Sequence, residues 1–413
     1  MKINIKKLIP KPFISFYHFA LSLLSAMIYG FPSKNIKLIG ITGTNGKTTV
    51  SEMIVKILEE QNIKVALINS MRFKIDNQEQ INYLRMTMPG RFFIQRFLRE
   101  SVNKGCQYAV MEVTSEGVKQ HRHCFLNFQT AIFTNLSPEH IESHGSFKKY
   151  CQAKIDFFKT VKNIHIINKD DEQAKYFIDL PCQNKILYSI QDITNINFNN
   201  NQITFQLNTV KFCLDLFGQF NIYNALAAVC FAKTQDISLK LCARALEKIK
   251  NISGRMELVV NTPFTVFVDY AFTPNALEKV YQAMQNLKPD LNSNLIAILG
   301  SCGGGRDTWK RPVLGSLAKK YCDQVIITNE DPYDEDPMEI IKQVAQGAGS
   351  KAKIILDRRT AISTALKLAK KNDIIIITGK GCEPSMCVKG KKIPWNEVKV
   401  VKEEFQKIYS GIV

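Results

Sequence analysis

One segment near the N-terminus has the residue types and spacing needed to hold the phosphates of a nucleotide. Residues 37–41 are apolar and predict a buried strand, and apolar side chains at helical spacing over residues 50–61 predict the helix that follows. In the turn between them, glycines let backbone N–H groups approach phosphate oxygens, and the start of the helix adds a positive dipole. The predicted nucleotide-binding residues are Gly43, Thr44, Asn45, Gly46, Lys47, Thr48 and Thr49.

Within this turn, Lys47 and Thr48 have the chemistry of ATP handling. The lysine supplies a mobile cation for the outer phosphates, and the threonine hydroxyl is suited to ligating Mg²⁺. The general phosphate-loop pattern places a glycine five residues before Gly46, where this chain has Ile41. The segment therefore predicts binding of a nucleoside triphosphate through a variant of the general loop.

Composition narrows the range of partners and compartments. The chain has 413 residues and a net charge of +18, enough length for two or three domains. Its basic residues are scattered and no nucleic-acid-binding motif is present, so we expect no nucleic-acid partner and assign the charge to holding phosphorylated substrates. The 11 cysteines form no C-x-x-C pair, which argues against zinc or a disulfide framework and favours a cytoplasmic location.

An apolar segment precedes the nucleotide-binding strand. Residues 13–31 carry no formal charge, and lysines flank them on both sides. Ser15, His18, Ser22 and Ser25 recur at helical spacing, so the predicted helix has a narrow polar stripe. Two interpretations have similar weight: a helix lying on the inner face of the membrane, and a helix packed on the protein itself. A complete membrane span is the less favoured third interpretation.

The elements that position these residues alternate between strand and helix, which is typical of parallel α/β sheets. Apolar runs at 107–111, 130–133 and 164–167 each end in polar residues, and ligands bind at the carboxyl ends of parallel strands. An asparagine-rich patch at 192–202 predicts a hairpin or loop. A second series of predicted strands covers residues 266–269, 295–299, 324–328, 354–356 and 374–378.

This alternation predicts an α/β fold in three parts. Residues 1–36 form an apolar N-terminal helical segment. Residues 37–252 form a P-loop ATP-binding domain with a mostly parallel sheet, and residues 253–413 form a Rossmann-like, doubly wound C-terminal domain. The boundary between the two domains is expected near Ser253-Gly254.

Ordered motifs from Lys37 to the C-terminus carry a family resemblance. They are Met111-Glu112-Val113-Thr114-Ser115, Phe133-Thr134-Asn135-Leu136-Ser137-Pro138-Glu139-His140, Tyr150-Cys151-Gln152-Ala153-Lys154, Gly218-Gln219-Phe220-Asn221-Ile222-Tyr223-Asn224-Ala225, Ser253-Gly254-Arg255-Met256-Glu257, Val268-Asp269-Tyr270-Ala271-Phe272-Thr273-Pro274, Gly303-Gly304-Gly305-Arg306-Asp307 and Gly379-Lys380-Gly381-Cys382-Glu383. By these motifs the chain resembles the Mur ligases of peptidoglycan synthesis, and within them the UDP-N-acetylmuramyl-tripeptide synthetases.

The resemblance implies an ATP-dependent ligase that joins an amino acid to a muramyl-peptide carboxylate through an acyl phosphate. It implies two Mg²⁺ sites, one at Thr48 and Glu112 and a second at His140 and Lys154, the lysine being converted by CO₂ to a carbamate. Lys47, Lys154, His140 and Arg255 are then the catalytic residues. Plainer interpretations are a surface acid for Glu112, a helix cap for His140 and an ordinary helical lysine at 154.

The resemblance also implies the remaining contacts of the site. Asn224 would reach the adenine base, while Arg255 and Asp269 would reach the phosphate and sugar from the C-terminal domain. The alternatives are helix caps for Asn224 and Asp269 and a surface salt bridge for Arg255. The implied substrate contacts are Thr114, Ser115, Arg306, Glu330, Asp331, Tyr333 and Glu383.

Departures from the family pattern concern the amino acid. Where diaminopimelate-adding members carry Asp-Asn-Pro-Arg, this chain has Glu330-Asp331-Pro332-Tyr333, followed by Asp334-Glu335-Asp336. An acidic loop without that arginine favours a monocarboxylic amino acid such as lysine or ornithine, unless the acids are solvated or cap the helix near Pro337. Phe272 and Cys382 stand where the family has histidines, and Thr114-Ser115-Glu116 replaces Ser-Ser-His.

The family's first domain, of about a hundred residues, holds the uridine diphosphate end of the substrate, and only residues 1–36 precede the phosphate strand here. We therefore expect either a partner protein that replaces this domain or a substrate held at the membrane. Other Mur-like enzymes without this domain modify lipid-linked peptidoglycan or add polyglutamate, and these activities are alternatives. A non-catalytic nucleotide-binding scaffold is a further alternative.

Overall fold

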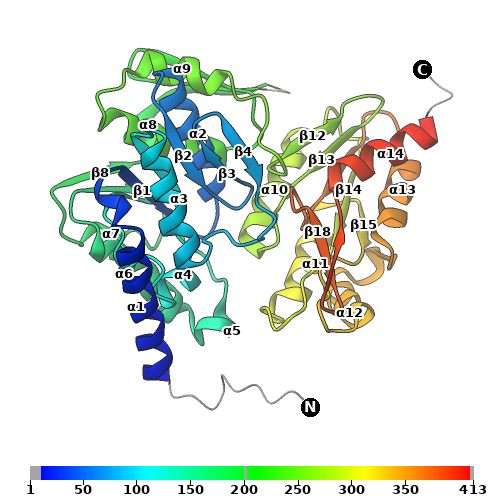
Figure 1. The fold of residues 1–413 in the computed structure, drawn as a ribbon. Helices are drawn as coiled ribbons and strands as arrows, with labels where there is room; N and C mark the ends of the chain where they lie inside the picture. The colour runs from blue at the N-terminus through cyan, green and yellow to red at the C-terminus, as the bar shows by residue number, and fades with distance from the viewer. Residues whose placement is uncertain (1–10, 200–201, 410–413) are drawn as a thin grey trace.

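The computed structural model describes residues 11–199 and 202–409, and two large sheets, each with helices on both faces, dominate it (Figure 1). Alternate residues of the central strands enter different cores. Leu38 and Ile39, for example, belong to separate apolar clusters, as do Ile296 and Ala297. This two-sided burial is the arrangement expected of doubly wound α/β sheets and confirms the predicted fold class.

The first sheet has eight strands in the order β4-β3-β2-β5-β1-β6-β7-β8. Six of them run parallel, and the β3–β4 hairpin continues the sheet antiparallel at one edge. Its strands are β1 (Lys37–Thr42), β2 (Val65–Ile68), β3 (Arg72–Ile75), β4 (Gln78–Ile81), β5 (Tyr108–Glu112), β6 (Phe128–Phe133), β7 (Ile164–Asn168) and β8 (Asn184–Tyr188). Because β1 lies between β5 and β6, the turn after it has Glu112 on one side and Thr134 on the other.

Helices cover both faces of this sheet, and α2 packs with α8 and α9 over one of them. The helices of this half are α1 (Lys11–Ile28), α2 (Lys47–Glu60), α3 (Arg91–Asn103), α4 (Ser115–Lys119), α5 (Ile141–His144), α6 (Phe147–Thr160), α7 (Lys175–Ile178), α8 (Phe220–Lys233) and α9 (Leu239–Glu247). Within the patch at 192–202, residues 193–199 and 202 lie in an antiparallel sheet of β9 (Ile193–Asn199), β10 (Gln202–Leu207) and β11 (Val210–Leu214), in agreement with the predicted hairpin.

The second large sheet has the order β12-β13-β17-β14-β15-β16, parallel except for β12. Its strands are β12 (Glu257–Val260), β13 (Thr265–Val268), β14 (Leu295–Leu299), β15 (Gln324–Ile327), β16 (Ala352–Ile354) and β17 (Ile374–Ile377), and a separate hairpin joins β18 (Ser385–Val388) and β19 (Lys391–Pro394). The helices are α10 (Pro274–Asn286), α11 (Lys310–Tyr321), α12 (Pro337–Ala348), α13 (Arg358–Leu368) and α14 (Glu397–Tyr409).

Several predicted boundaries are shifted by one to three residues, and two of these shifts have a clear structural cause. The strand predicted at 354–356 lies earlier and ends at Ile354, because the edge strand pairs through residues 352–354 only. The N-terminal helix ends at Ile28, before Gly30 and Phe31, which have positive φ angles of 65° and 50° that a right-handed helix does not allow. Across residues 11–199 and 202–409, no helix has the length and apolarity needed to cross a bilayer.

Candidate active site

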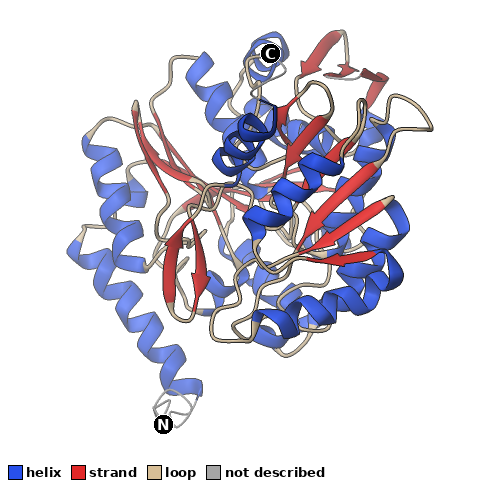
Figure 2. Ribbon diagram, turned by 90° about the vertical axis from the view of Figure 1, so that its right-hand side faces the viewer, coloured by secondary structure: helices blue, strands red, loops and turns tan. Residues whose placement is uncertain are grey.

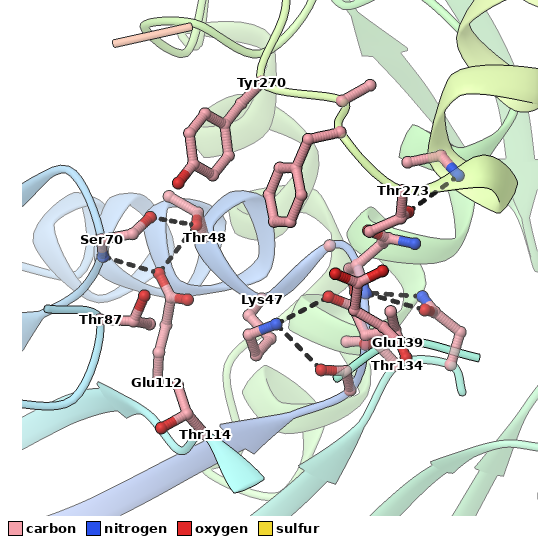
Figure 3. A pocket seen from close by; sticks show the side chains of 18 of the residues that line it. Lys47, Thr48, Ser70, Thr87, Glu112, Thr114, Thr134, Glu139, Tyr270 and Thr273 are labelled. Atoms are coloured by element: carbon pink, nitrogen blue, oxygen red, sulfur yellow. Dashed lines mark hydrogen bonds between the residues drawn. The ribbon is translucent and has the colours of Figure 1, made fainter. Parts of the chain in front are cut away.

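A cavity of about 790 Å³ lies at the carboxyl end of the first sheet and is closed by residues of the second half (Figure 3). All the predicted nucleotide and metal residues line it: Gly43, Thr44, Asn45, Gly46, Lys47, Thr48, Thr49, Glu112, His140, Lys154, Asn224, Arg255 and Asp269. The predicted substrate residues on its wall are Thr114, Ser115, Arg306, Tyr333 and Glu383. Residues from distant parts of the chain therefore line the same cavity.

The glycines of the phosphate loop are required by close approaches. A Cβ atom on Gly43 would lie 1.9 Å from Oγ1 of Thr134, and one on Gly46 would lie 2.5 Å from Oδ1 of Asn224. Lys47 Nζ donates to the carbonyl oxygens of Gly43 at 2.9 Å and Thr44 at 2.8 Å. Burial lowers the pKa of Lys47, an effect that nearby Glu112 opposes.

Glu112 and Thr48 meet at the start of α2. Oε1 of Glu112 accepts hydrogen bonds from Oγ1 of Thr48 at 2.8 Å and from the Ser70 N–H at 3.0 Å (Figure 3). The carboxylate is buried at the end of β5, so it is not a surface acid. Magnesium in phosphate-transferring sites is bound by one or two protein oxygens together with substrate phosphates, and this hydroxyl–carboxylate pair fits that donor set.

Arg255 reaches the same point from the other half of the molecule. Its Nη2 donates to Oγ1 of Thr48 and to Oγ of Ser70, both at 3.2 Å. Its guanidinium lies 4.5 Å from the ring centroid of Tyr270. These contacts exclude the surface salt bridge considered from the sequence, and they put a cation beside the hydroxyl of the phosphate loop.

His140 and Lys154 lie on the opposite wall among other cations. Lys154 is fully buried, and its Nζ donates to the carbonyl oxygen of Gly43 at 2.9 Å. Within the described ranges, no carboxylate forms an ion pair with it, and burial together with Lys47 lowers its pKa strongly. Burial and Lys154 lower the pKa of His140 to about 3. His140 stands at the N-cap position of α5, but its side chain makes no capping bond.

Across the described part of the chain, no three His, Cys, Asp or Glu side chains cluster as a preformed metal site. The second metal site implied by the resemblance would therefore have one neutral imidazole and an amine as its donors. An unmodified, protonated lysine repels a cation, whereas a carbamate on Lys154 would supply an anionic oxygen ligand. The residues at this wall fit a second Mg²⁺ only with that modification.

Asn224 and Asp269 flank the nucleotide loop and cap no helix. Asn224 lies in the second turn of α8, and its Nδ2 donates to Oδ1 of Asn221 at 2.9 Å. Asp269 accepts the N–H groups of Met256 at 2.7 Å and Ala271 at 2.6 Å, and burial raises its pKa. The cap of α10 is Thr273.

Two predicted substrate residues lie behind the cavity wall. Oε1 of Glu330 accepts a hydrogen bond from Sγ of Cys302 at 2.8 Å, and burial raises the pKa of Glu330. Oδ2 of Asp331 accepts from Lys380 at 2.9 Å and from Arg85 at 2.5 Å. The same loop's Asp336 caps α12 through the Met338 N–H, so the capping alternative is confirmed there. Neither Glu330 nor Asp331 presents a free acid to the cavity.

The other substrate residues have partners on the wall itself. Thr114 caps α4 through the Gly117 N–H at 3.1 Å, and Oγ of Ser115 lies 3.1 Å from Nε2 of His144. Glu383 accepts from the Tyr270 hydroxyl at 2.9 Å.

Arg306 is a solvent-exposed cation on the same wall. Its Nη2 donates to the hydroxyl of Tyr333 at 3.2 Å, and its guanidinium lies 5.7 Å from the centroid of that ring. It forms no ion pair within the described ranges.

Sequence reasoning assigned no role to several charged residues of the site, among them Arg85, Arg122 and Glu139. Arg85 inserts between Asp331 and Glu383, with both carboxylates 2.5 Å from its Nη2. Arg122 lines the cavity, and its Nη2 donates to Oε1 of Gln120 at 2.7 Å. Glu139 forms a buried ion pair of 2.8 Å with Lys310 of the other half. Arg85 and Arg122 reach the cavity through contacts between distant segments, for which the local sequence carries no signal, whereas Glu139 lies in the quoted motif that ends at His140.

Comparisons with known proteins agree with this geometry. The Mur ligase middle domain matches residues 41–232, and the family described as Mur ligase, glutamate ligase domain matches residues 254–381. A UDP-N-acetylmuramoyl-L-alanyl-D-glutamate–2,6-diaminopimelate ligase of Clostridium botulinum is 35% identical over 402 residues, covering 94% of this chain and 82% of the relative. A UDP-N-acetylmuramyl-tripeptide synthetase of Roseiflexus sp. is 34% identical over 411 residues, covering 92% and 80%.

Solved structures show the same fold. A structure of a UDP-N-acetylmuramoyl-L-alanyl-D-glutamate–2,6-diaminopimelate ligase superposes with a TM-score of 0.60 at 29% identity, over 91% of this chain and 79% of the other. Folylpolyglutamate synthase of Mycobacterium tuberculosis superposes with a TM-score of 0.72 over 87% and 92%, and at 17% identity this likeness concerns the fold alone. From the two family matches and the 35% identity over 82% of a curated relative, the chain belongs to the Mur ligase family of ATP-dependent amino-acid ligases.

Proposed function

We propose that this protein adds an amino acid to the terminal carboxylate of a muramyl peptide in peptidoglycan precursor synthesis, with conversion of ATP to ADP and phosphate. One observation supports this above the others. Thr48, Glu112 and Arg255 meet at the end of the phosphate loop, so a metal-binding pair and a cation from the other half converge on one position. Positioning and charge neutralisation are what phosphoryl transfer to a carboxylate requires.

The chain's own residues have distinct tasks in this proposal. Lys47 and the loop N–H groups bind the outer phosphates, and Arg255 neutralises charge as the γ-phosphate moves to the acceptor carboxylate. Thr48 and Glu112 would hold one Mg²⁺, and His140 and carbamylated Lys154 a second. When bound, Mg²⁺ offsets negative charge on the phosphate oxygens. The amine of the amino acid then attacks the acyl phosphate carbon, the amide bond forms and phosphate leaves.

Carbamylation of Lys154 needs an uncharged amine, and its surroundings favour one. Burial without a carboxylate partner, with Lys47 nearby, lowers the pKa of Lys154, which favours the neutral amine that can attack CO₂. Attack of Nζ on CO₂ forms a nitrogen–carbon bond and releases one proton to solvent. The product replaces a cation with an anion beside His140, which makes the wall suitable for a second Mg²⁺.

The acceptor and the amino acid occupy opposite ends of the cavity in this proposal. Thr114, Ser115 and Arg122 lie on the first half and suit the acceptor peptide, because Arg122 is a cavity cation without a carboxylate partner among the described residues. Arg306 and Glu383 lie on the second half, and together they suit the carboxylate and ammonium groups of an amino acid. Asn224 and Asp269 are proposed to contact the adenine and ribose.

The loop at 330–336 does not identify the amino acid that is added. The expectation of lysine or ornithine relied on free acids in the loop at 330–336, but Asp331 is already paired and Glu330 is buried. Relatives are named for 2,6-diaminopimelate. We therefore propose no single amino acid and use lysine, ornithine, alanine and diaminopimelate as the test panel.

The proposal also covers where in the cell the reaction takes place and which parts of the chain carry it out. We propose a cytoplasmic enzyme peripheral to the inner face of the membrane, in which residues 37–252 and 253–413 act as the two domains of the ligase. Either membrane contact through residues 13–31 or a partner protein would help to hold the carrier end of the acceptor. The apolar, acid-free N-terminal segment supports this.

The test is turnover of purified protein with UDP-linked and lipid-linked muramyl dipeptides and each amino acid of the panel. We expect ADP release that requires both the acceptor and an amino acid. Lys47→Ala should lower the rate by about 10³-fold because it removes a phosphate-neutralising charge, while Lys56→Ala, an exposed change on the same helix, should not. ADP release independent of both substrates, or nucleotide binding without turnover, would favour the non-catalytic scaffold.

A further inference from the structure

Helix α1 packs on the protein through its polar side. Oγ of Ser22 is buried and donates to the carbonyl oxygen of His121 at 2.8 Å. Arg91 on α3 donates through Nε to the Ser22 hydroxyl at 3.1 Å, and its Nη2 lies 2.9 Å from Nδ1 of His18. Ser25 is also buried. The stripe of serines and histidine therefore faces the protein, the reverse of an ordinary amphipathic surface helix.

The apolar side of α1 faces solvent as a consequence. Its exposed side chains recur at spacings of three, four and seven residues, so they form one stripe along an 18-residue helix of about 27 Å. They are between 42% and 70% exposed: Phe13, Phe16, Tyr17, Leu24, Met27 and Ile28. In both ribbon views the N-terminal part of α1 extends beyond the rest of the molecule (Figures 1 and 2). A continuous exposed apolar stripe of this size marks an interaction surface.

Charge identifies the kind of surface that this stripe fits. Residues 1–37 contain six lysines and no aspartate, glutamate or arginine. Lys34 and Lys37 are exposed just after the helix, and exposed Arg96 lies on α3, which packs against α1. A second copy of the chain would bring two such lysine-rich segments together in either orientation, and their repulsion disfavours self-pairing. An anionic surface that accepts apolar side chains is complementary to both features.

We propose that the exposed face of α1 docks on an anionic lipid surface, with Phe13, Phe16 and Tyr17 inserted at the level of the headgroups. Aromatic side chains on one face of a helix that lies in the interface plane, with lysines nearby, are the usual determinants of such binding. This identifies the lipid, rather than a partner protein, as what residues 13–31 contact.

The docking face is linked to the cavity wall. Arg91, which holds Ser22 of α1, also donates through Nη2 to the carbonyl oxygen of Gln120 at 3.0 Å. The Gln120 side chain in turn accepts from Arg122, a lining residue of the cavity. The consequence for activity rests on the proposed function: a docked chain would hold this end of its cavity close to an acceptor carried by the membrane.

The test is co-sedimentation of the full chain with vesicles of phosphatidylcholine alone and of phosphatidylcholine with phosphatidylglycerol. We expect binding to the anionic vesicles only, weakened by added salt. Phe16→Glu should weaken it by about tenfold or more. Phe198→Glu is the matched control, because Phe198 is 53% exposed on β9 and receives the same change. Met27→Glu, farther along the stripe, should reproduce the effect of Phe16→Glu.

Three results would overturn the proposal. The unmodified chain would remain in the supernatant with anionic vesicles, or Phe198→Glu would weaken binding as much as Phe16→Glu. Alternatively, the mass in solution would show a dimer that Phe16→Glu dissociates, which would assign the face to a second copy. Ligation of a UDP-linked acceptor by Phe16→Glu is measured in parallel. If the chain binds vesicles but ligates nothing, the proposed function is contradicted and the proposal of lipid docking is supported.

Discussion

The guanidinium of Arg255 lies 3.2 Å from the hydroxyl of Thr48, although 207 residues separate them in the chain. This contact exists only because the second half of the molecule closes over the phosphate loop of the first. The threonine also donates to Glu112, so one hydroxyl links the proposed metal-binding carboxylate to a cation from the closing half. The contact between the two halves therefore also brings the charge-neutralising groups together.

Arg255→Ala should therefore lower kcat by about 10²- to 10³-fold, since a cation aimed at developing phosphate charge is removed. The KM for ATP should change much less because the loop N–H groups and Lys47 remain. Arg244→Ala is the control: its guanidinium is exposed and pairs with Glu60. Steady-state kinetics with ATP as the varied substrate measure both constants. An unchanged kcat for Arg255→Ala would remove this arginine from the proposed mechanism.

Lys154 provides a prediction about a chemical modification. Lys154→Ala should be inactive, and added short carboxylic acids such as acetate or propionate should restore part of the activity by supplying the missing anion. Lys159→Ala on the same helix changes an exposed lysine and should behave as the unmodified chain. Ligation is measured with and without added acid. Failure of every acid to restore activity, together with no carbamate density in an experimental map, would contradict the modification.

Arg85 is expected to hold the two halves together at the end of the cavity that is proposed to bind the amino acid. Its Nη2 lies 2.5 Å from carboxylate oxygens of Asp331 and Glu383, both in the second half. Breaking a buried ion pair leaves charges uncompensated, so Arg85→Ala should lower kcat/KM for the amino acid by about 10²-fold. Small-angle scattering should show a larger radius of gyration. Arg359→Ala, an arginine paired within the second half, should change neither quantity.

The phosphate loop was predictable because its chemistry is local. Strand, glycines, Lys47 and helix follow one another in the chain, and the glycines are required by contacts that a Cβ would violate. Glu112 was predictable because it ends a buried strand beside the loop. The roles of these residues remain predictions, since proximity alone does not establish them.

The parts that could not be predicted depend on contacts between distant segments. Arg85 and Arg122 sit in irregular segments, and only folding brings them to the cavity. The acids at 330–331 look like a charged binding loop in the sequence, whereas their partners Cys302 and Lys380 lie elsewhere in the chain. For α1 the periodicity predicted a polar stripe, but not that this stripe would face the protein, because α3 and His121 supply its partners.

His123 gives a pH dependence of stability whose sign follows from burial. Burial, with a smaller contribution from His121, lowers the pKa of His123 to about 4, compared with 6.5 for an exposed histidine. Between these values the unfolded chain binds a proton that the folded chain does not, so stability falls as pH decreases from about 6.5 towards 4. Above pH 6.5 this contribution is constant. The full effect is about 3 kcal/mol.

The measurement is urea unfolding of the unmodified chain and of His123→Leu at several pH values from 7.5 to 4.5. The leucine cannot titrate, so its stability should fall less steeply on acidification, whatever the substitution does to packing at neutral pH. His140, whose pKa is lowered to about 3, should contribute in both proteins to the fall of unfolding free energy with decreasing pH. Equal slopes for the two proteins would mean that His123 takes up its proton in the folded state as readily as in the unfolded chain.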